Sequence, residues 1–339
     1  MIETVEELED ILSSPSGNVN RVVARLNGDI VILGVAGKMG PTIARMLVRS
    51  CLESGIKKKI TGVSRFSDKT IRETLERSGI ETVECNLLER KNVEKLPDAE
   101  NVIFLAGMKF GTTGKEPLTW AMNTLVPALV AEKYRYSRIV ALSTGNVYPL
   151  TKVAEGGCTE EHPPEPVGEY AQSCLGRERI FQYFSEKNRT PVATIRLNYA
   201  VELRYGVLVD IARRVMNGDS IDLRMGYVNV IWQADANRGI IECFSLCSIP
   251  PAIINLTGRE IISVRKTAEE FASIFGKKPV FVNEEEETAL LSNPSFFYET
   301  FGDSEITAEQ MITWVGEWIK KGNPTFDKPT HFETKNGRF

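Results

Sequence analysis

Histidine is almost absent from this chain of 339 residues, which contains only His162 and His331. A histidine-rich zinc site and a Ser-His-Asp hydrolase each need at least one well-placed imidazole, so this scarcity argues against both. Six cysteines are scattered along the chain without the density of a disulfide framework, and we expect reduced thiols. Cys243 and Cys247 have helical spacing, but neither a histidine nor a second cysteine pair lies near them in the sequence, so we expect packed thiols and no metal site.

Long apolar runs and blocks of one charge are also missing. No stretch approaches about 18 consecutive apolar residues, and the N-terminal segment MIETVEELED is acidic, without the basic start and apolar core of a secretion signal. We therefore expect a soluble, cytoplasmic protein without membrane contact. The net charge is −4 and the longest run of one sign is Glu284 to Glu287, so we expect no binding to nucleic acid.

The sequence does contain an alternation of short apolar, β-branched runs with amphipathic helical stretches, which is typical of a parallel sheet covered by helices on both faces. The expected strands are almost continuously apolar, as strands buried on both faces must be. They cover residues 29–36, 59–65, 81–86, 101–107, 138–145 and 191–198. The predicted fold class is therefore α/β, with a doubly wound, Rossmann-like parallel sheet.

A glycine-rich turn follows the first expected strand directly and opens a helix. Its sequence is Gly34-Val35-Ala36-Gly37-Lys38-Met39-Gly40. Gly34 permits the tight turn, Gly37 lets the backbone approach a pyrophosphate, and Gly40 lets the helix pack close to the strand. The first-turn amides and the helix dipole then face the anion, with Lys38 and Met39 beside it. In this strand–turn–helix context the motif predicts a dinucleotide site.

The end of the second expected strand bears on the choice between NAD and NADP. An NAD-specific site usually offers an acidic residue to the ribose hydroxyls, whereas this chain has Ser64 and Arg65. A guanidinium can hold a 2′-phosphate by a bidentate contact that a carboxylate would repel, so the sequence favours NADP and leaves NAD as the alternative. Lys38 either reinforces this preference or is a solvated lysine at the start of the helix.

The chain divides into four expected parts. Residues 1–28 form a helical N-terminal extension on the outside of the core, and residues 29–200 form the nucleotide-binding domain. Residues 201–321 form a smaller substrate lobe that is interleaved with the end of the sheet. Residues 322–339 form a surface tail, for which a loosely ordered terminus is the favoured interpretation. We expect segments 110–117 and 203–227 to contact a small-molecule substrate.

Taken together, these features resemble the short-chain dehydrogenase/reductase superfamily, in its extended branch of NAD(P)-dependent epimerases and dehydratases. The resemblance runs from Gly34 to about Lys320. Besides the glycine motif it rests on Leu105-Ala106-Gly107, Asn123, Ser143-Thr144-Gly145-Asn146-Val147-Tyr148, Tyr170-Ala171-Gln172-Ser173, Arg196-Leu197-Asn198 and Asn255-Leu256-Thr257-Gly258. It implies an enzyme that transfers a hydride on a sugar, sugar acid or nucleotide sugar, and a homodimer formed through the helices that precede and contain Tyr170.

The resemblance also implies roles for individual residues. Tyr170 is the expected acid/base, with Thr144 as its hydroxyl partner and Ser143 as a less favoured substitute. A phenol can move a proton at the substrate oxygen if its pKa, about 10 when unperturbed, is pulled toward neutrality. The other implied site residues are Asn123 for catalysis, Asn86, Leu105, Ala106 and Gly107 for the cofactor, and Lys109 and Asn198 for the substrate.

One position departs from the family pattern Tyr-x-x-x-Lys, in which the lysine holds the nicotinamide ribose and lowers the tyrosine pKa. This chain has Cys174 there, on the helix face that the ammonium would occupy, and a thiol supplies no positive charge. Three interpretations stay open. In the first, the protein is an enzyme in which Lys109 or, less favourably, Arg177 supplies the positive charge beside Tyr170. In the second, the enzyme catalyses a reaction on an acidic or activated carbonyl, which needs a less strongly activated Tyr170. In the third, the protein is a non-catalytic NADP-binding regulatory protein. The substrate, and the choice between net redox chemistry and epimerisation, also stay open.

Overall fold

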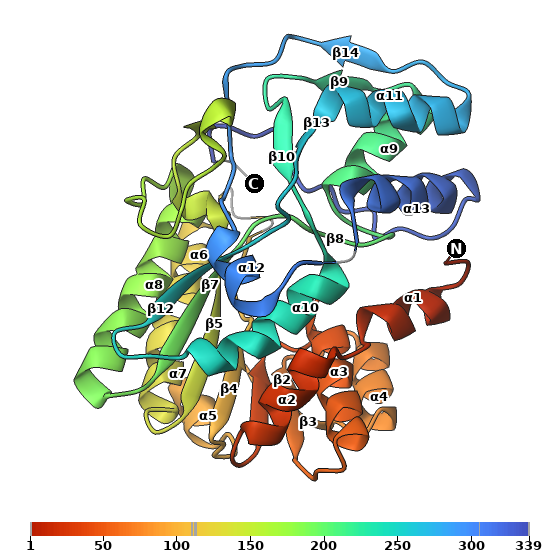
Figure 1. Ribbon diagram of the computed structural model, residues 1–339. Coiled ribbons are helices and arrows are strands. Elements are labelled where there is room, and N and C mark those ends of the chain that lie inside the picture. The colour runs from red at the N-terminus through yellow and green to blue at the C-terminus, as the bar shows by residue number, and fades with distance from the viewer. Residues whose placement is uncertain (1, 110, 112–113, 305, 338–339) are drawn as a thin grey trace.

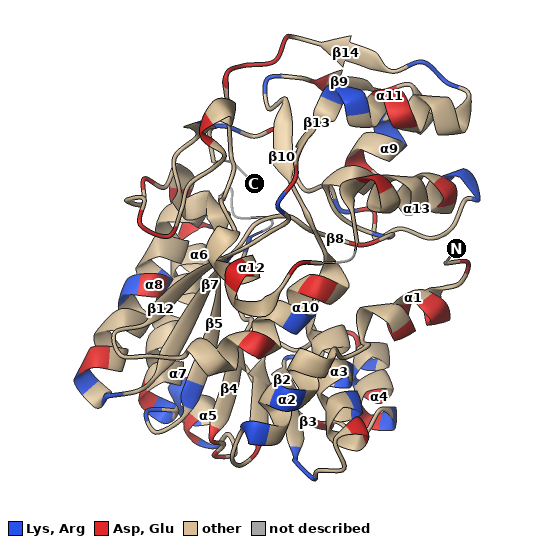
Figure 2. Cartoon of the chain, viewed as in Figure 1, with Lys and Arg blue, Asp and Glu red and all other residues tan. Residues whose placement is uncertain are grey.

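The computed structural model describes residues 2–109, 111, 114–304 and 306–337. It has a larger lobe built on a parallel sheet and a smaller lobe of helices and short strands, which lies above the larger one in Figure 1. In the view of Figure 2, the two signs of charge are interspersed over the helices of both lobes. Among the described residues, no helix combines the length and the apolar character needed to cross a bilayer.

The sheet of the large lobe has seven strands in the order β12-β7-β5-β4-β1-β2-β3, and every neighbouring pair is parallel. This doubly wound order confirms the expected fold class, and the chain changes direction across the sheet between β1 and β4, where such folds bind ligands. The strands are β1 (Ile30–Leu33), β2 (Ile60–Ser64), β3 (Glu81–Glu84), β4 (Asn101–Phe104), β5 (Arg138–Thr144), β7 (Val192–Leu197) and β12 (Ala252–Leu256).

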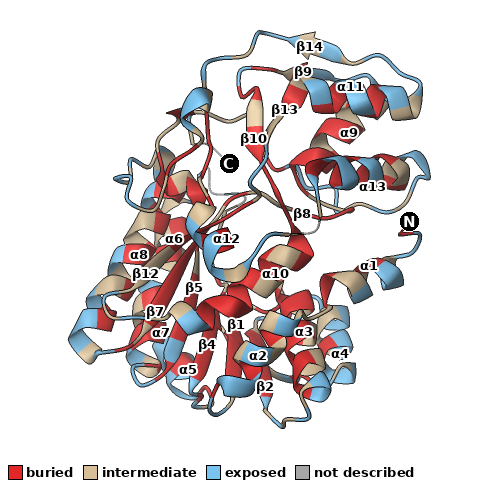
Figure 3. Ribbon diagram, in the orientation of Figure 1, coloured by how far each residue is buried: buried red, intermediate tan, exposed pale blue. Residues whose placement is uncertain are grey.

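Helices cover both faces of this sheet, and Figure 3 shows the strands as a buried layer between them. One face carries α2 (Gly17–Arg25), α3 (Gly40–Glu53), α4 (Lys69–Arg77) and α10 (Gln233–Glu242), and the other carries α5 (Arg90–Glu94), α7 (Val126–Lys133) and α8 (Gly168–Asn188). Strand β1 serves both layers, because successive side chains of a strand point to opposite faces. Ile30 and Ile32 pack in the first layer, and Val31 and Leu33 in the second.

The small lobe packs three helices around its own apolar core. They are α9 (Val207–Asn217), α11 (Val264–Phe275) and α13 (Ala308–Lys320). Pairs of short strands complete the two lobes: β9 (Ser220–Asp222) with β14 (Val280–Val282), β10 (Tyr227–Asn229) with β13 (Ile261–Ser263), β8 (Ala200–Val201) with β11 (Ile231–Trp232), and β6 (Thr151–Lys152) with β15 (Thr288–Ala289). Helices α6 (Glu116–Trp120) and α12 (Ser295–Phe301) lie in connecting segments.

The N-terminal extension packs into both cores, which is a closer association than the expected one on the outside. Helix α1 (Val5–Leu12) begins with a capping box between Thr4 and Glu7. Its Leu8 and Leu12 are buried in the small-lobe core. Val19 and Val23 of α2 are buried in the sheet layer, so the extension joins the two lobes.

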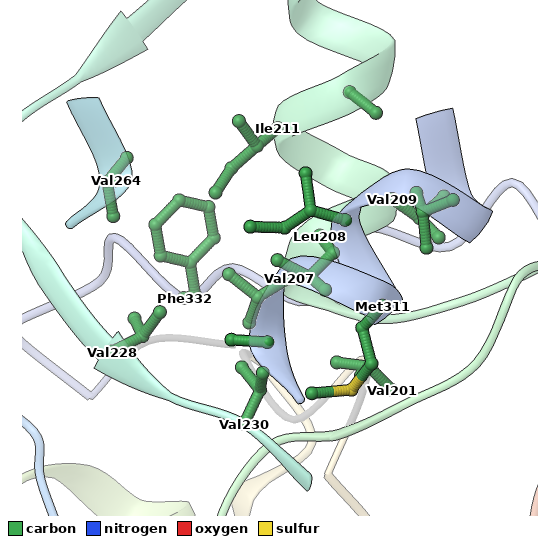
Figure 4. Close-up of a cluster of buried hydrophobic side chains, with 14 of the residues drawn as sticks. Val201, Val207, Leu208, Val209, Ile211, Val228, Val230, Val264, Met311 and Phe332 are labelled. Atoms are coloured by element: carbon green, nitrogen blue, oxygen red, sulfur yellow. The ribbon is translucent and has the colours of Figure 1, made fainter. Parts of the chain in front are cut away.

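The C-terminal segment contradicts the expectation of a loosely ordered surface tail. Thr330 is 3% exposed and Phe332 is 1% exposed. Phe332 enters the small-lobe core among Val207, Ile211 and Val228 (Figure 4). Asp210 accepts hydrogen bonds from the backbone N–H and the hydroxyl of Thr330, at 2.7 and 2.6 Å. We call residues 324–337 the C-terminal strap; residues 338 and 339 lie outside the described residues.

The strap depends on one apolar anchor, so Phe332→Ala should destabilise the small lobe. Removing a fully buried phenyl ring costs about 3 kcal/mol or more of the free energy of unfolding. Chemical denaturation followed by tryptophan fluorescence measures this loss. The matched control is Phe296→Ala, because Phe296 is 43% exposed and its loss should cost little. Equal stability of the two variants would contradict the anchoring role.

Candidate functional site

A cavity of about 380 Å³ lies at the carboxyl ends of the sheet strands, on the side of the small lobe. It brings together many of the residues that the sequence singled out: Gly34, Gly37, Lys38, Met39, Gly40, Leu105, Gly107, Lys109, Ser143, Thr144, Tyr170 and Asn198. Arg177 also lines it, as do residues that the sequence analysis did not select one by one: Met108, Leu142, Asn146, Leu197, Tyr199, Ala200, Tyr205, Gln233 and Thr330.

The glycine loop forms one wall of the cavity, and its geometry requires glycine at positions 34 and 40. Gly34 has φ +89°, and a Cβ there would lie 2.8 Å from the backbone nitrogen of Ala106. A Cβ on Gly40 would overlap the carbonyl of Val35, so α3 can begin close to β1 only with glycine. At Gly37 a Cβ would meet only the carbonyl oxygen of Gly34, at 3.3 Å. The loop and the first turn of α3 therefore fit the pyrophosphate of a dinucleotide.

Ser64, Arg65, Asn86 and Ala106 do not line this cavity. Ser64 ends β2 and Arg65 follows it with an exposed side chain. Asn86 follows β3, where its Oδ1 accepts a hydrogen bond from the backbone of Leu88 at 3.2 Å. Since β2 and β3 continue the sheet beyond β1, Ser64, Arg65 and Asn86 lie on the side of the glycine loop away from β4. Ala106 follows β4, and its backbone packs against Gly34.

Tyr170 lies in the first turn of α8 and is 8% exposed. It shares the cavity wall with Thr144, the last residue of β5. Burial raises the pKa of Tyr170 well above its ordinary value, and the neighbouring Cys174 raises it further. The charge of Arg177 and the hydroxyl of Thr144 act in the opposite direction on this pKa. Burial outweighs them, so the phenol is protonated at neutral pH.

Cys174 lies one turn after Tyr170 and is fully buried beside it, in a cluster with Val147, Tyr148 and Cys158. It does not line the cavity. Burial raises the pKa of the Cys174 thiol, which is therefore neutral. The position at which the family pattern has a lysine thus contributes no charge.

Arg177, the second cation suggested by the sequence, lines the same cavity as Tyr170 and Lys109. Its guanidinium is 6% exposed and donates from Nη1 to the carbonyl of Leu142 at 2.7 Å and from Nη2 to Oδ1 of Asn123 at 2.5 Å. A Cβ on Gly107 would overlap this guanidinium. Gly107 therefore leaves the space that Arg177 occupies.

Asn123 lies behind the cavity wall, in a π-helical turn over Ala121–Leu125. Its side-chain amide accepts from the backbone N–H of Met108 at 3.1 Å and donates to the hydroxyl of Ser173 at 2.9 Å. Asn123 thus ties the loop after β4 to α8 and holds Arg177 in place.

The hydroxyl groups of Thr144 and Ser143 have different hydrogen-bond partners. Ser143 donates to the buried carboxylate of Glu178 at 2.5 Å, and Glu178 pairs with Arg196 at 2.8 Å. The hydroxyl of Thr144 donates to Oδ1 of Asn146, which also lines the cavity. Of the two, Thr144 is therefore better placed to exchange its partner for a ligand.

Lys38 and Lys109 bring two ammonium groups to the cavity. Nζ of Lys109 lies 6.0 Å from the ring centroid of Tyr170, and burial lowers the pKa of Lys109 to about 8. Nζ of Lys38 lies 2.9 Å from the ring centroid of Tyr205. Burial and the charge of Lys109 lower the pKa of Lys38 to about 7. The ammonium group of Lys38 is therefore buried beside the small lobe, which contradicts the expectation of a solvated lysine.

Comparisons with solved structures support the fold at low sequence identity. MoeE5 in complex with UDP-glucose and NAD matches with a TM-score of 0.70 and 17% identity, over 87% of this chain and 99% of that chain. The UDP-glucose 4-epimerase of Thermotoga maritima with UDP-glucose has a TM-score of 0.70, 16% identity and the same coverage. Pal from Bacillus thuringiensis has a TM-score of 0.71 and 18% identity, over 87% of this chain and 100% of that chain.

No curated protein sequence matches the chain. The model of the NAD dependent epimerase/dehydratase family, however, matches residues 30–205, just over half of the chain. This segment holds the glycine loop, Thr144 and Tyr170, and it ends at Tyr205 on the far side of the cavity. The chain therefore belongs to the NAD dependent epimerase/dehydratase family.

Proposed function

We propose that the protein is an NAD(P)-dependent oxidoreductase or epimerase that acts on a sugar, sugar acid or nucleotide sugar. One observation carries this proposal: Tyr170 and Thr144 line the same cavity as the glycine loop. The residues proposed to transfer the proton and the loop proposed to bind the cofactor therefore line one cavity. Two neighbours of the same fold were solved with UDP-glucose, one of them together with NAD, which supports the class of substrate.

The cofactor's pyrophosphate would lie over Gly37 and the first turn of α3, between the glycine loop and the loop after β4. The bound dinucleotide supplies the chemistry of accepting or returning a hydride. The chain's own contribution is to position it: Leu105 and Gly107 border one side, and Leu142 and Leu197 form an apolar wall at the ends of β5 and β7. These side chains exclude water from the reacting carbon.

Tyr170 would exchange a proton with the substrate oxygen while Thr144 orients that oxygen by a hydrogen bond. Because burial keeps the phenol protonated, Tyr170 is better suited to donate a proton to a carbonyl oxygen than to remove one from an alcohol. The fixed guanidinium of Arg177 and the ammonium of Lys109 would stabilise the phenolate that forms after donation. They take over the electrostatic role that Cys174 cannot fill.

Arg65 supports a preference for NADP, since it follows β2 with an exposed guanidinium beside Ser64. Arg65→Met should raise the Kd for NADPH by roughly tenfold or more, because a charge-assisted contact with phosphate contributes about 1.5–3 kcal/mol. The Kd for NADH should not change. Titrations followed by nicotinamide fluorescence measure both, with Arg77→Met as the matched surface control. Equal losses for NADH and NADPH would contradict the assignment of Arg65.

Tyr170→Phe should lower the rate of hydride transfer by about 100-fold or more while NADH still binds, because positioned acid/base catalysis contributes at least that factor. The reduction of an oxidised sugar by NADPH or NADH, followed by nicotinamide absorbance in a stopped flow, is one suitable assay. An unchanged rate in Tyr170→Phe would remove the phenol from the mechanism.

Cys174→Lys tests the missing cation directly. An ammonium beside Tyr170 should lower the pKa of the phenol, so the rate of alcohol oxidation should reach its maximum at lower pH than in the natural chain. Cys174→Ser, which keeps the size and adds no charge, should leave the pH profile in place. If every variant and the natural chain bind NADPH but turn over no sugar, the alternative of a non-catalytic NADP-binding regulatory protein is correct.

We also propose a homodimer formed through α7, α8 and the segment before them. Three large apolar side chains are exposed on this side: Leu118 is 43%, Leu125 46% and Tyr183 56% exposed. Burial of such side chains is a common driving force for association. Light scattering should give twice the mass of the chain, and a monomer at all concentrations would contradict this interface.

A further inference from the structure

Tyr199 has an unusual backbone conformation for an aromatic residue. Its φ is +43°, in the left-handed region that favours glycine and that a bulky side chain rarely adopts. Six of the described non-glycine residues have a positive φ, and Tyr199 is the one among them that lines the cavity. Strained backbone of this kind gathers at ligand-binding sites, where the surrounding structure holds it against its own preference.

Hydrogen bonds on both sides of Tyr199 hold this turn. The backbone N–H of Asn198 donates to the carbonyl of Leu256 at 3.0 Å, and the carbonyl of Tyr199 accepts from the backbone N–H of Ile231 at 3.2 Å. The turn therefore lies where the chain leaves β7 of the large sheet and enters the pair β8–β11. A glycine would make the same turn without strain, so the turn itself does not require a tyrosine.

The turn changes which residues reach the cavity. In an extended strand, successive side chains point to opposite faces, so residues 197 and 199 would share one face and residues 198 and 200 the other. Leu197, Asn198, Tyr199 and Ala200 nevertheless all line the cavity. The left-handed turn breaks the alternation and adds Tyr199 to the cavity wall. Tyr199 also packs against the apolar core of the small lobe, which limits its movement.

The phenol of Tyr199 lies on the side of the small lobe. Burial and the charge of Glu333 in the C-terminal strap raise its pKa, and Tyr199 acts in turn on the pKa of Tyr205. Tyr205 and Thr330 line the same cavity. This side of the cavity is therefore aromatic and hydroxyl-bearing, and it comes from other segments than the end of β5 and the first turn of α8, which supply the proposed proton-transfer residues.

We propose that Tyr199 is a platform on which one face of the substrate's sugar ring packs, so that the ring is held between the small lobe and Tyr170. The faces of a closed sugar ring carry C–H groups, which pack well on an aromatic ring, while its hydroxyl groups point outward to polar partners. This inference rests on the proposed function, from which it takes the class of substrate. It adds a specificity: the site selects a closed sugar ring over an open chain with similar polar groups.

Two other roles for Tyr199 compete with this one. If the side chain only completes the small-lobe core, its loss lowers stability and leaves every ligand's affinity unchanged. If it contacts the nicotinamide of the cofactor, its loss raises the Kd for NADPH. The three roles therefore differ in which measured quantity responds to removal of the ring.

The test compares the natural full-length chain with Tyr199→Leu, which removes the ring and keeps an apolar side chain, and with Tyr199→Phe, which keeps the ring. Tyr199→Gly is a second variant without the ring, and it accepts the left-handed backbone if leucine does not. The matched control is Tyr227→Leu, because Tyr227 packs against the same core and does not line the cavity. Thermal unfolding shows that each variant is folded.

Isothermal titration calorimetry with the NADPH-saturated protein gives the Kd values for four probes. Glucuronate and UDP-glucose each carry a closed sugar ring. Gluconate and UDP are their counterparts, the first with an open chain and the second without the sugar. The Kd for NADPH is measured separately for every variant.

We expect at least one of the two sugar-ring probes to lose roughly tenfold in affinity in Tyr199→Leu and Tyr199→Gly, and to keep its affinity in Tyr199→Phe. The Kd values for gluconate, UDP and NADPH stay unchanged, as do all values in Tyr227→Leu. The proposal is overturned if the sugar-ring probes keep their affinity without the ring of Tyr199, if gluconate or UDP loses as much, or if the Kd for NADPH rises instead. Binding of neither sugar-ring probe to the natural chain is a different result, because it contradicts the substrate class of the proposed function and removes the platform with it.

Discussion

The backbone of Gly34 lies directly against the backbone of Ala106, and the arrangement of the site depends on this contact. β1 and β4 are neighbours in the sheet. The positive φ of Gly34 turns the chain just after β1 and brings its backbone against the residues that follow β4. A side chain at position 34 would not fit in the space between the two backbones. The glycine loop and the loop after β4 therefore open onto one cavity. Lys38 and Lys109, which are 71 positions apart in the sequence, both line this cavity as a result.

Burial and the neighbouring positive charge shift the pKa of Tyr170 in opposite directions. Burial favours the neutral phenol, and the thiol of Cys174 adds nothing that would favour the phenolate. The charge of Arg177 lowers the pKa of Tyr170 and so acts against burial. The Arg177 guanidinium is held by Asn123, and it fits there because Gly107 has no side chain. The balance leaves a protonated phenol among cations. Such a site is prepared to give a proton to a carbonyl oxygen and to stabilise the charge that remains.

The sequence predicted those parts of the structure that rest on local patterns. The expected strands and the glycine loop follow from runs of apolar residues and from glycine spacing, which need no knowledge of distant contacts. The strap was missed because its segment is mostly polar and because the partners of its buried Phe332 lie about 100 residues earlier in the chain. Thr330 was missed as a cavity residue for the same reason, whereas Tyr205 lies in the segment 203–227 that was expected to contact the substrate.

Arg177 illustrates the limit of reasoning from spacing alone. Helical periodicity identifies Cys174 as the neighbour of Tyr170, but it cannot show that a guanidinium further along α8 turns back into the cavity. That contact depends on Gly107 and on the π-helical turn at Asn123, which belong to other segments of the chain. The fold brings both candidate cations to the cavity: Nζ of Lys109 lies 6.0 Å from the ring centroid of Tyr170, and Arg177 is held by Leu142 and Asn123.

The most direct test of the account is a side-by-side equilibrium titration of the natural chain with NADPH and NADH, followed by nicotinamide fluorescence. The account predicts saturable binding of both dinucleotides, with the lower Kd for NADPH. Binding of neither would contradict it, because the cavity, Tyr170 and the cationic lining would then have no cofactor to act with.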